Sequence, residues 1–292
     1  MADLQRLLSQ QPLLVVNKPP GPTSHQVVDY VKRILDVDKA GHGGTLDPNV
    51  TGVLPVATQR YTRITHALLD STKEYVCLAY FHDAITSNEL DHLIDDYTGE
   101  ITQTPPVKSS VKREPRQRTI QAIDVLDKHS QEVLLRVNCD GGTYIRKLID
   151  DMGDDFGAGA HMQELHRTRA GPFHIDQAIN LHELSDYKAF YEEGETDILE
   201  DYLLPLEAGV EHLPKIFVDD GCVNPLSHGS YLKAPGVLRV AGSFDEGDMV
   251  AVLHDNELLL IGNATMSNHD VEEVGIGVVV ETTQVYKQPD DR

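Results

Sequence analysis

Residues 41–57 read GHGGTLDPNVTGVLPVA, a loop rich in glycine and proline that leads into an apolar run. The loop contains one carboxylate, Asp47, although the whole chain has 47 acidic residues. It lacks the G-K-[ST] ending of a nucleotide-binding P-loop and the G-x-G-x-x-G spacing of a dinucleotide site. An Asp-Pro turn with a purely structural role is one interpretation. A rigid loop that fixes a carboxylate also suits nucleophilic chemistry at a sugar–base bond, as in retaining glycosidases.

A carboxylate with that role must stay ionised, so we expect a cationic partner that lies with it away from bulk water. The segment GTYIR, residues 142–146, supplies Arg146 as this partner, with Tyr144 two residues earlier. Tyr75, at the end of a predicted strand in KEYV, has an aromatic ring that can stack on a nucleobase. Each tyrosine alone is more typical of a hydrophobic core. Their combination with Asp47 and Arg146 indicates a site.

The composition is typical of a reduced, cytoplasmic, globular protein. With 292 residues, 40% of them hydrophobic, the chain is long enough for a large catalytic domain and one small domain. No apolar run approaches the roughly 18 residues of a membrane span, and the N-terminus has no secretory signal pattern. The three cysteines have no C-x-x-C spacing, and no histidines or acids have metal-ligand spacing. We therefore predict no disulfide, no metal and no membrane contact.

The net charge of −22, from 25 basic and 47 acidic residues, is the unusual feature. Such a surface repels nucleic acid at ordinary ionic strength. Either the partners are not nucleic acids, or the protein works in high salt, where the Debye length falls to about 3 Å at 1 M. We favour a halophilic cytoplasm, which predicts that nucleic-acid binding persists in molar salt.

One segment has the opposite charge. Residues 105–118, PPVKSSVKREPRQR, contain five basic residues and a single acid, Glu114. A solvated loop is the simpler interpretation of such a segment. We prefer an arm that contacts phosphates and is poorly ordered without its partner. The arm would bind RNA through Lys108, Lys112, Arg113, Arg116 and Arg118.

Apolar spacing and turn residues predict an alternation of helices and strands up to about residue 184. Helices are expected over 25–35, 62–69 and 88–97 and from Thr143 onward, and strands over 12–18, 74–81, 119–127 and 132–139. We predict a catalytic domain over 12–184 and an acidic helical linker over 185–212. Short strands split by Gly, Asp and Asn then predict a small all-β barrel over 213–288.

Six segments stand in the order and at the approximate spacing found in one known family: NKPPGPTSHQVV, GHGGTLDPNVTGVLPVA, KEYV, PPVKSSVKR, CDGGTYIRKLIDDMG and ELHRTRAGPF. The chain thus resembles the TruB and dyskerin family of RNA pseudouridine synthases over nearly its whole length. The basic arm and the PUA-type segment PKIFVDDGCVNPLSHGSYLKAPGV resemble archaeal homologues of dyskerin more than bacterial TruB. This resemblance implies an α+β protein with a mixed, largely antiparallel sheet, peripheral helices and a C-terminal PUA barrel packed on the catalytic domain.

The resemblance also implies an activity, the isomerisation of uridine to pseudouridine, without cofactor or metal. Asp47 would be the catalytic aspartate, Arg146 its ion-pair partner, and Tyr75 the ring that stacks on the flipped uracil. The N-glycosidic bond would break, the uracil would rotate, and C5 would bond to the sugar. Attack by Asp47 on C1′, attack on C6, and removal of a sugar proton all remain open.

The remaining family positions are pocket residues and RNA contacts. The PUA barrel would hold the ACA end of a guide RNA or the acceptor end of a tRNA. Gly43 and His166 depart from the family pattern, which has Ser or Thr at the first position and Arg at the second. The implied pocket residues are Lys18, which would support the catalytic loop, His42, Tyr144 and Leu165. Arg167 and Arg169 would help shape the site or contact the RNA backbone, and His228 and Gly229 of the PUA barrel would contact RNA.

An archaeal dyskerin-like enzyme would work in an H/ACA ribonucleoprotein on rRNA and tRNA. The implied partners are a guide RNA, a small zinc-ribbon protein, a small β-barrel protein and a kink-turn-binding ribosomal-type protein. Two alternatives remain. One is a guide-independent synthase that modifies the tRNA T-loop, and the other is a non-catalytic scaffold that holds a guide RNA.

Overall fold

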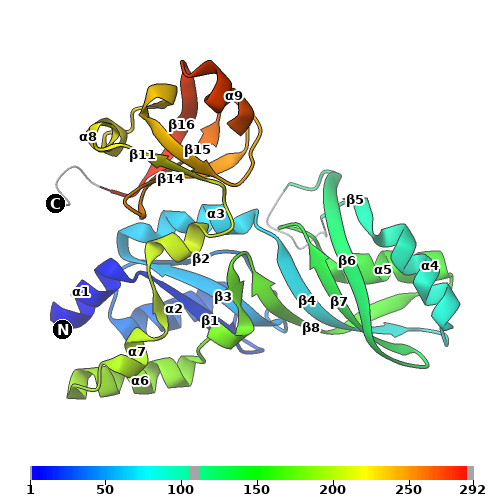
Figure 1. The fold of residues 1–292 in the computed structure, drawn as a ribbon. Helices are drawn as coiled ribbons and strands as arrows, with labels where there is room; N and C mark the ends of the chain where they lie inside the picture. The colour runs from blue at the N-terminus through cyan, green and yellow to red at the C-terminus, as the bar shows by residue number, and fades with distance from the viewer. Residues whose placement is uncertain (1, 106–111, 288–292) are drawn as a thin grey trace.

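The computed structural model describes residues 2–105 and 112–287, which form a large sheet with peripheral helices and a smaller C-terminal β-domain (Figure 1). The large sheet has the path β10-β1-β3-β8-β4-β7-β6-β5, with β2 added to β3 and β9 added to β8. Among the pairs of named strands in this sheet, β3 and β8 are parallel and the others are antiparallel. The predicted mixed, largely antiparallel sheet is therefore confirmed. Its strands are β1 (Leu13–Lys18), β2 (Ala40–His42), β3 (Thr51–Thr58), β4 (Lys73–Phe81), β5 (Gly99–Gln103), β6 (Arg116–His129), β7 (Glu132–Cys139), β8 (Ala160–Ala170), β9 (Phe173–His174) and β10 (Leu203–Leu204).

The strands follow from the apolar pattern of the sequence. Side chains of β4 alternate strictly between buried and partly exposed, as expected for a strand with one face on a core. β3 is buried along almost its whole length, because its side chains pack into two different cores: Val53 and Ala57 belong to one hydrophobic cluster, and Leu54 and Val56 belong to another. Sequence periodicity identifies β4 and β7 to within about one residue.

The helices lie at the periphery of the sheet, and their ends have clear causes. α2 (Ser24–Leu35) begins after a capping box between Thr23 and Gln26. α5 (Ile145–Phe156) begins two residues later than predicted, because the backbone of Tyr144 is extended. The other helices of this domain are α1 (Ala2–Gln10), η1 (Gln59–Ile64), α3 (Thr65–Leu69), α4 (Ser87–Tyr97), η2 (Ile175–Gln177), α6 (Leu181–Glu193), α7 (Asp197–Glu200) and η3 (Leu206–Val210).

The segment 185–212, predicted as a linker, is corrected by the structure to an integral part of the catalytic domain. It is helical in α6 and α7, but it continues into β10, which pairs with β1 at the edge of the large sheet. Leu199 and Leu203 are buried in the same hydrophobic cluster as Val16 of β1. The prediction of a linker rested on the acidic composition of the segment and overlooked the few leucines that pack it against the sheet.

The C-terminal domain is a six-stranded sheet with the path β12-β16-β15-β14-β11-β13 around its own hydrophobic cluster. It also carries two helices, α8 (Asp220–Ser227) and α9 (Asn268–Val274), and the turn η4 (Ala234–Gly236), so the predicted all-β barrel is incomplete as a description. The strands are β11 (Lys215–Val218), β12 (Leu232–Lys233), β13 (Val237–Ala241), β14 (Met249–His254), β15 (Glu257–Ala264) and β16 (Val278–Val285).

The two domains share a continuous hydrophobic cluster. Tyr61 and Ile64 of η1 belong to it from the catalytic side, and Leu258 and Tyr286 from the C-terminal side. Figure 1 shows the C-terminal domain seated directly above α3. The Leu258 amide also donates a hydrogen bond to Glu207 Oε1 at 2.8 Å. A shared core of this kind fixes the orientation of the C-terminal domain relative to the large sheet.

Candidate active site

Asp47 lies in the loop between β2 and β3, and a buried lysine holds this loop. Lys18 is fully buried at the end of β1, and its Nζ donates to the carbonyls of Pro19, Pro48 and Val50 at 2.9–3.0 Å. Burial lowers the pKa of Lys18, and the charge of nearby Asp47 acts in the opposite direction. Lys18 thus supports the part of the loop that follows Asp47, in line with the expected role, and its burial separates it from a substrate.

A second buried cation, Arg167 of β8, holds the other end of the loop. Its side chain is 1% exposed. Its Nε donates to the Val53 carbonyl at 2.7 Å and its Nη2 to the Gly44 carbonyl at 3.0 Å. Of the two roles expected for Arg167, the structure favours shaping the site over contacting RNA, because a guanidinium with these carbonyl partners faces the protein interior. Its role is to fix the Asp47 loop.

Ser24 is a further residue that supports the Asp47 loop. Its Oγ accepts a hydrogen bond from the Leu46 amide at 2.8 Å and donates to the Leu46 carbonyl at 3.1 Å. The first turn of α2 is thereby tied to the residue before Asp47. Sequence gave no signal for this contact, because Thr23 occupies the capping position and Ser24 has no pattern of its own.

Arg146 forms the expected ion pair with Asp47. Its Nη2 lies 2.6 Å from Asp47 Oδ2, although 99 positions separate the two residues. Both side chains are 54% exposed, so the expectation of a pair removed from bulk water is wrong. An ion pair this open adds little to folding stability. The pair fixes the orientation of the Asp47 carboxylate and leaves it open to solvent.

Tyr75 is the third residue of β4 and lies beside Arg167 in the β4–β8 pairing. It is 8% exposed and belongs to the core cluster under α5. Burial raises the pKa of its hydroxyl, while the Arg167 guanidinium acts in the opposite direction. Tyr75 is therefore a neutral phenol at neutral pH, held between the core and the Asp47 loop.

Tyr144 and Leu165 are the other two aromatic or apolar residues predicted to line the pocket. Leu165 pairs with Cys77 across β8 and β4 and packs on the core that contains Tyr75. Tyr144 precedes α5, and the buried side chain of Gln103 binds both its backbone amide and its carbonyl, at 3.0 and 3.2 Å. Gln103 is a positioning residue that sequence analysis missed, because a lone glutamine in a strand has no distinguishing pattern.

His42 lies at the start of the Asp47 loop, with its ring edge-on to the ring of His25 at a centroid distance of 5.0 Å. Within the described residues, its buried Nδ1 has no hydrogen-bond partner. Burial, together with the nearby charges of His25 and Arg167, lowers the pKa of His42 to about 4. His42 therefore stays neutral through the physiological pH range.

This pKa shift predicts an acid-sensitive fold. Between pH 6.5 and about 4 the unfolded chain binds a proton at His42 and the folded chain does not, so stability falls as the pH falls. We expect the loss to reach about 2 kcal/mol at pH 4 after allowance for partial solvent access. His42→Asn should remove this component from urea unfolding curves. His66→Asn, at an exposed position of α3, is the control, and equal pH slopes in both variants would contradict the assignment.

The described part of the basic arm begins beside this site. Arg118 of β6 lies over Gly142, where an added Cβ would be 3.1 Å from its Nη2, and Gly142 lies in the turn before α5, the helix that contains Arg146. Lys112 pairs with Glu114 at the surface, and both side chains are exposed. Arg113 is exposed and Arg116 partly exposed. Lys108 lies outside the described residues.

The other predicted RNA contacts have different surroundings. Arg169 binds Asn138 Oδ1 at 2.9 Å and Thr72 Oγ1 at 3.1 Å at the edge of the catalytic sheet. His228 and Gly229 are exposed after α8 in the C-terminal domain, and the structure does not bring them to the Asp47 loop. His166, which departs from the family pattern, contacts Thr51 Oγ1 at 2.7 Å through its Nδ1.

A search for metal sites and membrane spans among the described residues found neither. No three His, Cys, Asp or Glu side chains in residues 2–105 and 112–287 are grouped to hold a metal ion. Over the same ranges, none of the helices combines the length and apolar character that a bilayer crossing requires.

Three family models match consecutive parts of the chain. Residues 32–145 match the N-terminal domain of TruB family pseudouridylate synthases, residues 146–211 the C-terminal domain of tRNA pseudouridylate synthase B, and residues 214–286 the PUA domain. A protein named probable tRNA pseudouridine synthase B from Pyrococcus abyssi is 43% identical over 96% of this chain and 85% of its own length. Its counterpart from Methanopyrus kandleri is 44% identical over 94% of this chain and 82% of its own length.

Solved structures extend the likeness to three dimensions. The crystal structure of a Cbf5–Nop10–Gar1 complex contains a chain that is 41% identical, with a TM-score of 0.93 over 98% of this chain and 88% of that one. A structure of an H/ACA ribonucleoprotein bound to a substrate RNA containing 2′-deoxyuridine matches with a TM-score of 0.89, 39% identity and coverage of 98% and 88%. Together with the family models, these similarities identify the chain as a member of the TruB family, an RNA pseudouridine synthase with a C-terminal PUA domain.

Proposed function

We propose that the chain converts specific uridines of RNA to pseudouridine as the catalytic subunit of a guide-directed H/ACA ribonucleoprotein. The observation that carries this proposal is the exposed Asp47–Arg146 pair on a loop held by two buried cations. A rigid loop with an accessible carboxylate is preorganised for a nucleotide that arrives from outside.

In this proposal the target uridine leaves its base stack, which costs a few kcal/mol, and enters the site beside Asp47. Arg146 holds the carboxylate in one orientation through their ion pair. The N1–C1′ bond breaks, the uracil turns against the Tyr75 ring, and a C5–C1′ bond forms. The C5 proton leaves to a base and N1 gains a proton, so substrate and product are isomers. Attack on C1′, attack on C6 and removal of a sugar proton all use the ionised form of Asp47.

Partners are proposed from the structures that resemble this chain. One is a Cbf5–Nop10–Gar1 complex and another an H/ACA ribonucleoprotein with its substrate RNA. This supports a guide RNA and small accessory proteins as partners here, with the basic arm and the exposed end of α8 around His228 as RNA contacts. The net charge of −22 supports the further proposal that the assembly works in the cytoplasm at high salt.

Guide-independent modification of tRNA is a second candidate. It is favoured by the curated relatives, which are named as probable tRNA pseudouridine synthases, and by the match of residues 146–211 to the C-terminal domain of tRNA pseudouridylate synthase B. Both activities use the same Asp47 site, so they differ in how the RNA is presented and not in the chemistry.

Tritium release from C5-labelled uridine, measured in molar KCl, distinguishes the candidates. We expect release only when guide RNA and accessory proteins are added to the chain. Release from bare tRNA without them would favour the tRNA enzyme. If an assembled, RNA-bound complex released no label from any substrate, the chain would be a non-catalytic scaffold.

A separate measurement, RNA binding as a function of salt, tests the high-salt proposal. Loss of RNA binding between about 0.2 and 1 M salt would contradict it.

A further inference from the structure

Lys73 is a buried cation to which the reaction described above gives no role. It is the first residue of β4 and is 3% exposed. Its Nζ donates to the carbonyls of Leu68, Leu69 and Ser71 at 2.9, 3.3 and 2.5 Å, and it lies 3.0 Å from Ser71 Oγ. These acceptors belong to residues 68–72, the α3 turn, where α3 ends. Lys73 therefore binds carbonyls that the last turn of a helix leaves without partners.

The α3 turn lies against two segments of the active site, the loop between β2 and β3 and the segment before α5. In the loop, Gly43 packs so closely on Leu68 that an added Cβ would lie 2.8 Å from the Leu68 Cβ. In the segment before α5, an added Cβ at Gly141 would lie 2.3 Å from the carbonyl oxygen of Leu69. Only glycine fits where chain segments approach this closely. Both segments contact the same turn, so its position sets where they lie relative to one another.

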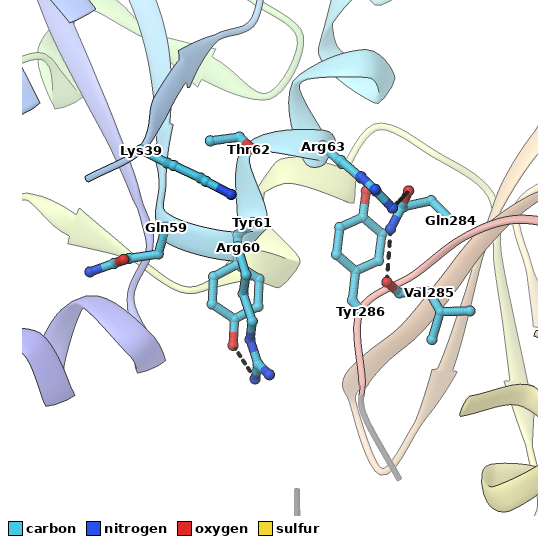
Figure 2. Close-up of a pocket in the computed structure, with 9 residues that line it drawn as sticks. All are labelled: Lys39, Gln59, Arg60, Tyr61, Thr62, Arg63, Gln284, Val285 and Tyr286. Atoms are coloured by element: carbon cyan, nitrogen blue, oxygen red, sulfur yellow. Dashed lines mark hydrogen bonds between the residues drawn. The ribbon is translucent and has the colours of Figure 1, made fainter. Parts of the chain in front are cut away.

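The other end of α3 is fixed at the junction of the two domains. η1 runs directly into α3, and Figure 2 shows Arg63 of η1 bound to Gln284 of β16, with Nη1 donating to Oε1 at 3.0 Å. His212 Nε2 lies 3.0 Å from the Ala67 carbonyl. Burial lowers the pKa of His212, and the positive charge of Lys73 acts in the same direction. Because α3 has only five residues, an anchored start and a lysine at its end leave it little freedom to tilt.

The charge of Lys73 changes near neutral pH. Burial, together with the charges of Arg167 and Arg169 of β8, lowers the pKa of Lys73 to about 7, while Cys139 of β7 and Asp70 of the α3 turn act in the opposite direction. The ammonium group has three N–H donors. The neutral amine has two donors and a lone pair, which cannot face a carbonyl oxygen. Above this pKa, one acceptor in the α3 turn therefore loses its donor.

We propose that Lys73 is a positioning residue of pseudouridine formation, which holds the α3 turn so that Asp47 and Arg146 meet. This role rests on the proposed function for the reaction that it serves. Arg167 fixes the Asp47 loop from β8, whereas Lys73 fixes the turn that this loop and the segment before α5 both contact. Its stem also reaches the loop, since an added Cβ at Gly44 would lie 3.8 Å from Lys73 Cε. A misplacement of about 1 Å can lower the rate of a catalysed step by about 100-fold.

Lys73→Met tests this role, because methionine has a similar volume and no N–H donor. In the assembled complex with saturating RNA, we expect single-turnover tritium release to fall by about 10- to 100-fold, with RNA affinity within about twofold of wild type. The wild-type rate should fall as the pH rises through about 7, and Lys73→Met should lose this dependence. Lys215→Met is the matched control and should keep the wild-type rate. Lys215 also donates to backbone carbonyls, those of Glu211 and Leu213 at 3.0 and 3.4 Å, but from β11 of the C-terminal domain.

A folded Lys73→Met variant that releases tritium at the wild-type rate, or that keeps the wild-type pH dependence, would overturn the proposal. If this variant does not fold, Ser71→Ala takes its place. Ser71 Oγ accepts from Lys73 Nζ and donates to the Leu68 carbonyl at 2.8 Å, so the substitution removes two hydrogen bonds of the α3 turn. We expect Ser71→Ala to lower the rate by about threefold to tenfold. An unchanged rate in this variant would also overturn the proposal.

Crystal structures of the same variants distinguish this inference from the proposed function. The folded variant should show a separation between the Cα atoms of Asp47 and Arg146 that differs from wild type, whatever its activity. If wild type released no tritium from any RNA, the proposed function would fail, and this separation would still decide the role of Lys73. An unchanged separation would show that Lys73 stabilises the fold without positioning the two residues.

Discussion

Asp47→Asn is expected to abolish pseudouridine formation and to leave RNA binding unchanged. The amide is nearly the same size, so the loop held by Lys18 and Arg167 should keep its shape. It cannot act as a nucleophile or a base, and it loses the charge that pairs with Arg146. Removal of a reacting group of this kind lowers turnover by about four orders of magnitude or more. Single-turnover tritium release, with RNA saturating, measures the loss.

The same experiment separates the enzyme from a scaffold. Asp29→Asn, which removes an exposed acid from α2, is the control and should retain full activity. Because the Asp47–Arg146 pair is half exposed, its loss should change the unfolding free energy by less than about 1 kcal/mol. If Asp47→Asn released tritium at the wild-type rate, Asp47 would have no part in the chemistry. A large loss of stability would show that the loop, and not the charge, had been damaged.

Gly52→Ala is expected to have the largest effect on stability near the site. An added Cβ would lie 2.2 Å from the Arg167 carbonyl oxygen and 2.8 Å from its backbone nitrogen, and backbone atoms in a sheet cannot move aside separately. The φ of 106° adds strain for any residue with a Cβ. We expect a loss of about 3 kcal/mol or more in urea unfolding. Separation of β3 from β8 would also withdraw Arg167 from Gly44, so tritium release should fall.

Gly21→Ala isolates the effect of the contact from the effect of the backbone angle. Gly21 has a φ of 107°, almost the same as Gly52, but an added Cβ there would meet no heavy atom within 4 Å. We expect this variant to lose only about 1 kcal/mol from backbone strain. Similar losses of unfolding free energy in the two variants would show that backbone strain alone causes the loss. They would also show that β3 and β8 tolerate a methyl group between them.

Much of the catalytic arrangement could be predicted because it depends on short motifs. Asp47 and Arg146 each stand in a glycine-flanked segment, and their pairing followed from the need of a fixed carboxylate for a cation. Their exposure could not be predicted, because it depends on what other elements leave uncovered. The positions of β4 and β7 followed from their apolar runs, whereas the largely antiparallel sheet was expected from the family resemblance.

The two buried cations show where sequence analysis reached its limit. Arg167 stands in a basic motif that suggests contact with RNA, yet it faces inward because carbonyls of Gly44 and Val53 accept its hydrogen bonds. Those carbonyls lie more than a hundred positions away in the chain. Charge in a sequence does not reveal whether backbone acceptors from distant loops converge on it. The pairing of β10 with β1 was missed for a similar reason, since two leucines in an acidic segment are too short a signal.

The position of β10 also sets the order in which the protein can assemble on the ribosome. β1 is made first, but one of its two neighbours in the sheet, β10, comes from residues 203–204. At about 5–20 residues per second, translation takes roughly 10–40 s to supply that partner. Meanwhile the apolar strand LLVV has an open edge that can pair with other nascent chains. The strand synthesised earliest is thus among the last to be completed.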